Sequence, residues 1–164
     1  MKLVTIDGRE VAGRPGVMLE NGEILDLSSA PSRLTESQWI PHSVVSILAA
    51  GRSGLETTRR IVDNVNALSE QGRAELRKSN ALRRMADTTL MSPLRRPGLM
   101  VINLAAAGDS PDLDPVYIKS PNAAAGSGST LNLPGFAGNR VAVTPLFAVI
   151  LGRSLHEADV AEAR

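Results

Sequence analysis

The chain contains no cysteine among its 164 residues. This absence excludes disulfide bonds, a catalytic thiolate and a zinc site with cysteine ligands. A chain without disulfides fits a reducing compartment, so we expect a cytoplasmic protein. Histidine is also scarce, with His42 and His156 as the two examples. Neither is linked by a motif to a serine or an aspartate, so we interpret both as surface residues and not as catalytic bases.

Aromatic side chains, net charge and long apolar runs are scarce as well. Proteins that bind single-stranded nucleic acid stack the bases on several aromatic rings, and a net charge of +1 gives no electrostatic attraction for a polyanion. No uncharged apolar run approaches the roughly 20 residues that a membrane-spanning helix needs, and the first apolar run is too short for a signal peptide. We therefore predict no nucleic-acid partner and no membrane association. The aromatic residues are Trp39, Tyr117, Phe136 and Phe147.

The sequence that is present begins with the signals of a small antiparallel sheet. Residues 3–6 are apolar or β-branched and predict a short strand. Residues 16–20 and 23–27 flank Asn21 and Gly22, a pair that favours a hairpin because both turn positions tolerate positive φ. The chain is therefore expected to open with a small sheet that contains a hairpin.

Helical segments are expected next. Residues 43–50 predict a helix that ends at Gly51, because glycine readily adopts the left-handed conformation that ends helices. Ser53 and Glu56 have the spacing of a capping box, which predicts that a second helix opens there. Apolar or β-branched side chains then recur at helical spacing: Leu55, Thr58, Ile61, Val62, Val65 and Leu68.

A third, more polar helix is predicted over residues 73–85. Its basic side chains are diluted by acidic ones, so we interpret them as a solvated helix face and not as a nucleic-acid patch. These basic residues are Arg73, Arg77, Lys78, Arg83 and Arg84.

The composition changes over residues 92–98, where proline and glycine predict a domain boundary. Beyond it, short strands are predicted over 99–104, 116–119 and 141–151, and a final helix from Ser154. Residues 126–130 lack the lysine of a phosphate-binding loop, so a tight turn between strands is predicted. The expected fold class is α+β, with a leading domain of a hairpin and helices over 1–92 and a β-rich domain over 93–164.

Three groups of residues occur in order along the second of these domains. The first is Arg96-Pro97-Gly98-Leu99-Met100-Val101. The second is Lys119-Ser120-Pro121, followed by Gly126-Ser127-Gly128 and Leu131-Asn132-Leu133-Pro134. The third is Ala148-Val149-Ile150-Leu151-Gly152-Arg153 with Glu157-Ala158-Asp159. With this order and spacing the chain resembles the catalytic domain of the fumarylacetoacetate hydrolase superfamily, and its hairpin and helices are similar to the small leading domain of many members. The resemblance covers nearly the whole chain and about the first half of a usual member, so it implies a truncated, partial β-rich domain of that type.

The resemblance implies metal-dependent chemistry whose ligands this sequence lacks. In the family, carboxylates hold Mg²⁺ or Mn²⁺, and the metal chelates the keto-enol oxygens of the substrate and stabilises an enolate. The positions of two family glutamates read Thr144 and Leu146 here, and the third family ligand falls beyond the last residue. The family histidine, in an N-Y-x-D-H segment, aligns with Ser110, while the preceding aspartate is kept as Asp109. We therefore expect no metal site and no cofactor in this chain, and a divalent ion such as Mg²⁺ only if a partner chain supplies the ligands.

Lys119, Asp109 and Ser110 are the candidate catalytic residues that the resemblance implies. By family precedent, Lys119 pairs with a carboxylate of the substrate; the alternative is a strand-end lysine in solvent. Asp109 also belongs to an acidic cluster with Asp112 and Asp114. The cluster lacks the glycine-centred pattern of a calcium loop, so turn and cap roles are favoured over a cation site.

For function, we predict a catalytically degenerate family member that acts as a non-catalytic or assisting subunit of a partner-dependent complex. A partial domain would expose unpaired sheet edges and apolar surface, so we expect either a fumarylacetoacetate hydrolase-like partner chain or self-association. The alternative is a subunit of a heteromeric hydrolase, decarboxylase, isomerase or cyclase, which acts on a keto/enol small molecule and has its active site completed by another chain. A metal-independent activity on the same scaffold and an inactive fragment are further alternatives.

Overall fold

The computed structural model of the protein describes residues 1–8, 11–30, 34, 42–95, 100–103, 116–132, 145 and 148–150. The contacts within the chain divide it into two units, Met1–Ser129 and Thr130–Arg164. All the helices and strands described below belong to the first unit. The predicted boundary between 1–92 and 93–164 stays a prediction.

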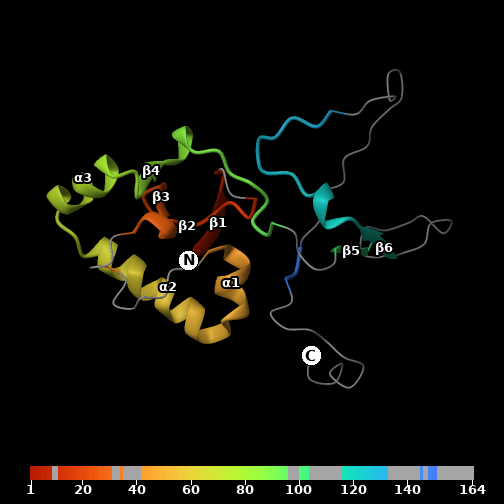
Figure 1. The fold of residues 1–164 in the computed structure, drawn as a ribbon, viewed down its shortest axis with the longest axis horizontal. Helices are drawn as coiled ribbons and strands as arrows, with labels where there is room; N and C mark the ends of the chain where they lie inside the picture. The colour runs from red at the N-terminus through yellow and green to blue at the C-terminus, as the bar shows by residue number, and fades with distance from the viewer. Residues whose placement is uncertain are drawn as a thin grey trace. The chain divides into compact units, whose positions relative to one another are not determined.

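In the described residues, a four-stranded antiparallel sheet forms with its strands in chain order. The strands are β1 (Lys2–Ile6), β2 (Arg14–Met18), β3 (Glu23–Asp26) and β4 (Leu82–Arg84). Between β3 and β4 the chain forms the helices α1 (Val44–Ala49), α2 (Gly51–Asn66) and α3 (Glu70–Lys78). Figure 1 shows these elements in order. Helices inserted into an antiparallel sheet place this part of the chain in the α+β class, as the sequence predicts.

The predicted hairpin is confirmed, but its turn differs from the expected one. Met18 pairs with Ile24, the Leu19 N–H donates to the Glu23 carbonyl at 2.8 Å, and the Gly22 N–H donates to the Leu19 carbonyl at 3.1 Å. Gly22 has φ +81°, whereas the φ of Asn21 is not positive. The turn is therefore a three-residue type with glycine in the left-handed position. The side chain of Asn21 instead hydrogen-bonds Glu23, through its Oδ1 at 3.1 Å and its Nδ2 at 2.7 Å.

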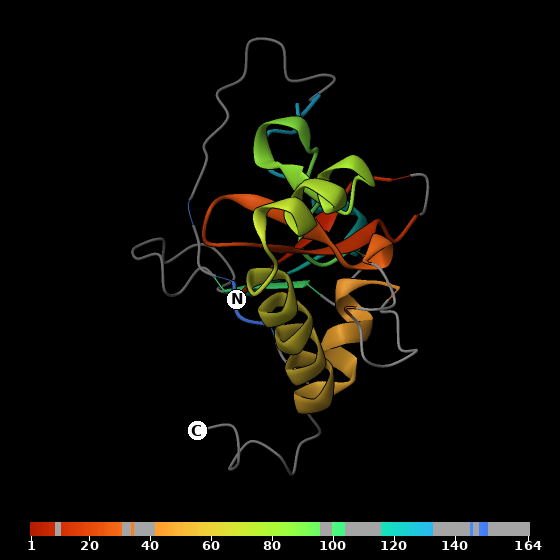
Figure 2. The same cartoon turned by 90° about the vertical axis from the view of Figure 1, so that its left-hand side faces the viewer.

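The first two helices meet at Gly51 without a connecting loop. Gly51 has φ +60° and ends α1 as predicted. The predicted capping box at Ser53 is wrong, because α2 begins at Gly51 and no described side chain caps it. The capping box lies one helix earlier: the Ser46 N–H donates to Ser43 Oγ at 3.0 Å, and the Ser43 N–H donates to Ser46 Oγ at 3.1 Å. The two helices lie side by side, as Figure 2 shows.

Close packing between α1 and α2 depends on a residue without a side chain. A Cβ added at Gly54 would collide with the Ile47 carbonyl oxygen and would lie 2.9 Å from the Ala50 Cβ. One turn later, the buried Thr58 hydroxyl donates to the Gly54 carbonyl at 2.8 Å. Gly54 thus fixes how closely the backbones of these two helices approach each other.

The third helix is shorter than the sequence predicts. It begins at Glu70, with Ser69 as its N-cap, and it ends at Lys78. Asn80 then takes a left-handed backbone with φ +57° and turns the chain. Residues 82–84, expected to continue the helix, pair with β3 as β4. The helix prediction fails there because sheet pairing and the burial of Leu82 outweigh helix propensity.

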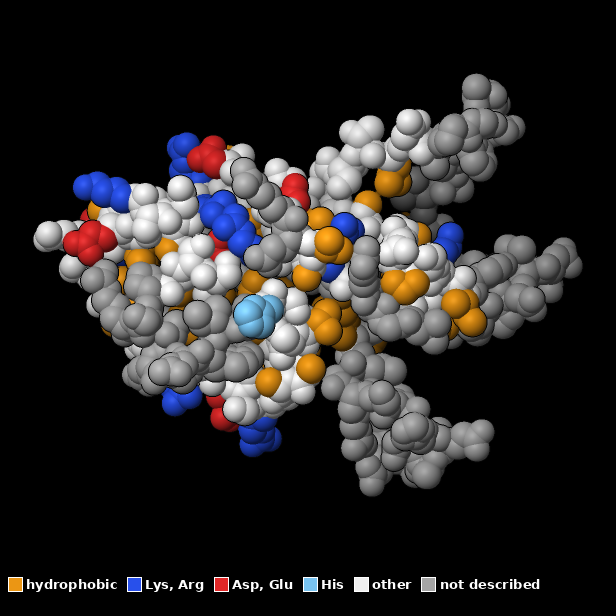
Figure 3. Space-filling model, viewed as in Figure 1, with side chains coloured by type: hydrophobic (Ala, Val, Ile, Leu, Met, Phe, Trp, Pro, Cys, Tyr) orange, Lys and Arg blue, Asp and Glu red, His pale blue; other side chains and the backbone are white. Residues whose placement is uncertain are grey.

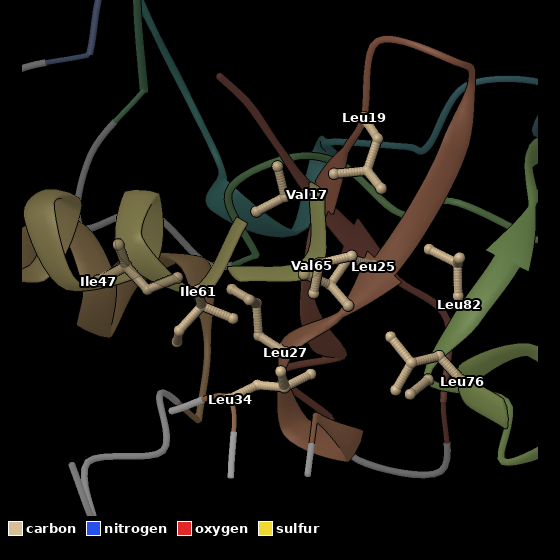
Figure 4. Packing of buried hydrophobic residues seen from close by; sticks show 11 residues of the cluster. Val17, Leu19, Leu25, Leu27, Leu34, Ile47, Ile61, Val65, Leu76 and Leu82 are labelled. Carbon is tan, nitrogen blue, oxygen red and sulfur yellow. The ribbon is translucent and has the colours of Figure 1, made fainter. Parts of the chain in front are cut away.

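The main hydrophobic core lies between the sheet and the helices. Ile61 and Val65 of α2 are buried in it, which confirms the predicted periodicity, while Leu55 at the start of that pattern is exposed. Figure 4 shows the side chains converging from strands and helices. The cluster comprises Val17, Leu19, Leu25, Leu27, Leu34, Ile47, Ile61, Val65, Leu76, Ala81 and Leu82. A smaller cluster contains Val4, Ile6 and Ile24, with Met18 and Leu90 packed against it.

The outer edge of β1 is partly covered by residues 89–91. The Met91 N–H donates to the Thr5 carbonyl at 2.8 Å, and the Asp7 N–H donates to the Thr89 carbonyl at 2.9 Å. The Thr5 hydroxyl then donates to the carbonyl of Pro93 at 2.7 Å. Proline has no N–H to donate to a neighbouring strand, so the backbone pairing of this segment with β1 cannot continue through Pro93.

The second part of the first unit contains the two-stranded hairpin of β5 (Met100–Asn103) and β6 (Val116–Lys119). Both strands are confirmed at the predicted places. The turn at 126–129 is also confirmed, with a hydrogen bond of 3.2 Å from the Ser129 N–H to the Gly126 carbonyl and φ +77° at Gly128. Of the strand predicted over 141–151, the structure describes Pro145 and residues 148–150, which lie in no strand. The predicted final helix lies outside the described residues.

Within the described ranges, no helix combines the length and the apolar character that crossing a bilayer would require.

Candidate functional site

Of the three predicted catalytic residues, the structure describes Lys119. It is the last residue of β6, lies opposite Met100 and is exposed to solvent. Asp109 and Ser110 lie outside the described residues, as do Asp112 and Asp114 of the acidic cluster. The structure therefore places Lys119 without bringing it together with the other two candidates.

The positions that the resemblance assigns to metal ligands, Thr144 and Leu146, also lie outside the described residues. Among the residues that are described, no group of three or more His, Asp or Glu side chains could hold a metal ion. His42 is exposed, as predicted, and Figure 3 shows histidine on the molecular surface in pale blue. His156 is outside the described ranges, so its predicted surface role stays a prediction.

Next to Lys119, the β5–β6 hairpin exposes an apolar cross-strand pair. Val101 and Ile118 lie directly opposite each other in the antiparallel register. The exposed fraction is 55% for Val101 and 73% for Ile118. Side chains that face each other across two strands lie on the same side of the hairpin. One side of β5–β6 therefore presents apolar surface, and Lys119, the next residue along β6, belongs to the opposite side of the hairpin.

A buried carboxylate joins three parts of the sheet. The side chain of Asp26 is fully buried, and its Oδ2 lies 3.1 Å from Arg14 Nη1 and 3.2 Å from Arg83 Nη2. Its Oδ1 accepts hydrogen bonds from the Ser28 N–H at 3.1 Å and the Ser28 hydroxyl at 2.6 Å. Both carboxylate oxygens are thus occupied by partners within the protein. We interpret this cluster as structural, because it leaves no free acceptor for a ligand.

A second ion-pair network joins α3 to the hairpin turn. Arg77 Nε lies 2.7 Å from Glu23 Oε1, and Arg77 Nη1 lies 2.5 Å from Glu70 Oε1. The hydrogen bond from Arg77 lowers the pKa of the Glu23 carboxyl below its ordinary value of about 4.5, and the hydrogen bond from Asn21 acts in the same direction. Of the basic residues interpreted as a solvated face, Arg77, Arg83 and Arg84 each pair with a carboxylate.

A groove of about 560 Å³ lies between the β1–β2 side of the sheet and α2. Lys2, Met18 and Glu20 line it from the strands and the turn that follows β2. Arg59, Asp63 and Asn66 line it from α2. The apolar part of the lining includes Val17, Leu19 and Val62.

Sequence reasoning did not find this groove. The spacing of residues 59, 62, 63 and 66 places them on one face of a helix. This shared face is the one feature of the groove that the sequence indicates. The strands that complete the groove are more than thirty residues earlier in the chain, so their meeting with α2 is a property of the tertiary fold.

No protein-family model matches the chain, and no curated protein matches it. The resemblance described above therefore rests on the quoted motifs alone.

Proposed function

We propose that the chain is a catalytically degenerate fumarylacetoacetate hydrolase-like protein that acts as a non-catalytic or assisting subunit of a partner-dependent complex. In this proposal, β5 and β6 belong to a β-rich domain of that type over 93–164. The replacement of two anionic ligand positions by Thr144 and Leu146 supports the loss of metal chemistry, because neither a hydroxyl group nor an isobutyl group can replace a carboxylate at a divalent ion.

The exposed pair Val101 and Ile118 is the observation that carries the proposal of a partner. A two-stranded hairpin by itself is at best marginally stable in water, and it gains stability when another strand or surface covers its apolar side. Complete burial of a valine or isoleucine side chain contributes about 1.5–3 kcal/mol. Since each side chain is more than half exposed, covering both would contribute about 2–4 kcal/mol.

The first test is the mass of the protein in native solution, alone and after affinity capture from its source cells. We expect a complex of fixed stoichiometry, either with a longer chain that carries the two ligand glutamates or with a second copy. Recovery of a monomer at working concentration in both preparations would contradict the proposal.

A double variant tests whether the hairpin makes the contact. Val101→Thr with Ile118→Thr keeps the β-branched shape that strands favour and adds a hydroxyl group to the exposed side. Val11→Thr is the matched control, because Val11 is 59% exposed and lies outside the hairpin. We expect the double variant to lose the complex and the control to keep it. An intact complex in the double variant would exclude the hairpin as the contact.

The alternative, a heteromeric enzyme whose active site another chain completes, is favoured by the exposure of Lys119 at the end of β6. An ammonium group there is available to a substrate carboxylate held by a partner. The test is turnover of a keto/enol acid such as oxaloacetate by the purified complex with Mg²⁺. A loss of about tenfold or more in Lys119→Ala, with Lys78→Ala unchanged, would favour the enzyme, since about 1.4 kcal/mol of binding corresponds to tenfold. Equal turnover in both variants would favour the assisting subunit.

A further inference from the structure

The turn between β2 and β3 contains an asparagine followed directly by a glycine, and both Asn21 and Gly22 are exposed to solvent. In such a pair the backbone nitrogen of the glycine can attack Cγ of the asparagine side chain, because glycine has no Cβ to hinder the approach. At Gly22 an added Cβ would meet no atom within 4 Å. The two reacting groups are therefore adjacent in the chain, and the attacking residue borders open space.

The reaction of such a pair needs water as its one further reactant. The glycine nitrogen loses its proton to the solvent and forms a bond to Cγ. The bond from Cγ to Nδ2 then breaks, and the side-chain nitrogen takes up a proton and leaves as ammonia. Water opens the resulting succinimide ring at either carbonyl. One opening gives aspartate, and the other gives isoaspartate, in which the main chain runs through Cγ and gains a methylene group.

In the folded chain, hydrogen bonds hold both reacting groups. The Gly22 N–H donates to the Leu19 carbonyl at 3.1 Å, so the proton that must leave is the one that makes this bond. Oδ1 of Asn21 accepts from the Glu23 N–H at 3.1 Å, and Nδ2 of Asn21 donates to Glu23 Oε2 at 2.7 Å. The attacking nitrogen must approach the face of the side-chain amide, and these two bonds fix the direction in which that face points. Departure of the ammonia also breaks the bond to Glu23.

Arg77 of α3 holds the Glu23 carboxylate in the position from which it restrains Asn21. Arg77 Nε lies 2.7 Å from Glu23 Oε1, and Arg77 Nη2 lies 3.2 Å from Glu23 Oε2. A guanidinium group that binds both oxygens fixes the orientation of a carboxylate as well as its position. The hydrogen bonds from Arg77 and Asn21 also lower the pKa of the Glu23 carboxyl, so this group is an anion at neutral pH.

From these contacts we propose that Asn21 is a site of spontaneous deamidation and that the ion pair of Arg77 with Glu23 sets its rate. Release of Arg77 frees the Glu23 carboxylate and with it the side-chain amide of Asn21. The aspartate product then acts on the same contacts, because a carboxylate oxygen replaces the Nδ2 donor beside Glu23 Oε2 and two anions face each other. The site is separate from the proposed function, because none of its residues lies in β5 or β6, and the failure of either proposal leaves the other standing.

The test is incubation of the full chain at about pH 8, followed by mass spectrometry of the proteolytic peptide that contains Asn21. We expect Arg77→Gln to deamidate at Asn21 about tenfold faster than the parent chain. Tenfold in rate corresponds to about 1.4 kcal/mol in the barrier, roughly the contribution of one hydrogen bond to a charged group. The parent chain unfolded in urea should react faster still. Equal rates for Arg77→Gln and the parent chain, or for the parent chain with and without urea, would overturn the inference.

Two control variants separate the ion pair from a general loss of stability. Arg84→Gln removes a different surface ion pair, that with Asp87, and Gly54→Ala introduces a collision between α1 and α2. Both keep the side chains of the turn and of Arg77, so we expect both to deamidate at the parent rate. Acceleration in Gly54→Ala equal to that in Arg77→Gln would show that unfolding sets the rate, and it would overturn the role of the ion pair.

The consequence of the reaction is tested with Asn21→Asp, which is one of the two products. The aspartate can still accept from the Glu23 N–H, so the change isolates the new charge beside the Glu23 carboxylate. We expect a lower midpoint of urea unfolding at pH 7, and we expect Asn21→Asp to lose this effect when Glu23→Gln removes the second anion. Equal midpoints for Asn21→Asp and the parent chain would contradict the predicted repulsion.

Discussion

Replacement of Asp26 by asparagine tests the buried ion cluster with almost no change in shape. The amide oxygen can still accept the hydrogen bonds from Ser28, so the change isolates the charge. Two guanidinium groups, those of Arg14 and Arg83, lose their anionic partner, and hydrogen bonds to charged groups contribute about 1.5–3 kcal/mol each. Their side chains are 27% and 24% exposed, so water recovers part of this loss. We expect unfolding free energy to fall by about 3 kcal/mol, at the low end for breaking a buried ion pair.

The measurement is urea unfolding of Asp26→Asn and the parent chain, followed by far-ultraviolet circular dichroism at pH 7. Asp87→Asn is the control, because Asp87 pairs with Arg84 at the surface, where the two side chains are 56% and 77% exposed. Exposed pairs contribute about 1 kcal/mol or less. A loss below about 1 kcal/mol in Asp26→Asn, equal to that of the control, would refute the structural role that we assign to the cluster.

Three further changes test packing, titration and backbone conformation. Gly54→Ala should lower the unfolding free energy by about 1–3 kcal/mol through overpacking between α1 and α2; Gly72→Ala, where an added Cβ has normal contacts, should raise it by about 0.4–1 kcal/mol in the same urea titration. The pKa of Glu23 is lowered in the folded state, so its pairing with Arg77 should stabilise the fold above about pH 4.5 and lose this effect as pH falls further. Unfolding of Glu23→Gln should accordingly be less pH-dependent below pH 4.5 than that of the parent chain, and an identical dependence would contradict the assignment. Asn80→Ala should cost about 1–2 kcal/mol because alanine is disfavoured at φ +57°, whereas Asn80→Gly should be tolerated; equal melting temperatures for the two variants would argue against backbone strain.

Local signals in the sequence predict most of the strands and the end of the first helix. The hairpin follows from Asn21 and Gly22 between two apolar runs, although only Gly22 takes positive φ. The end of α1 follows from Gly51. Alternation and turn residues act over a few positions, so one sequence contains enough information to place these elements.

The end of α3 and the start of α2 could not be predicted in the same way. Residues 82–84 have no strong strand signal, and they become β4 because β3 offers an edge with which they pair. Ser53 has the spacing of a cap, yet α2 is already formed there because it starts directly at Gly51. Both errors arise where contacts distant in sequence, or a neighbouring helix, decide the local structure.

For the candidate sites, sequence reasoning reached Lys119 through a resemblance and missed the groove. Lys119 ends the predicted strand and is exposed to solvent, and whether it pairs with a substrate carboxylate stays a prediction. The groove combines Lys2 and Glu20 with Arg59 and Asp63, which separate segments contribute. None of these four residues belongs to a recognisable motif, so their proximity becomes visible only in the folded chain.

The direct junction of α1 and α2 at Gly51 fixes the number of residues that this part of the chain can contain. No loop separates α1 from α2. The chain there therefore has no flexible segment that could accommodate an extra residue inserted between Gly51 and Ile61. It would turn the rest of α2 by about 100° around its axis, which would carry Ile61 and Val65 away from the core in which they are buried. The turn at Gly128, where an added Cβ would have no neighbour within 4 Å, has no such constraint, since insertions there can bulge into solvent. Relatives of this chain should therefore vary in length at their turns and diverge by substitution alone along this helical corner.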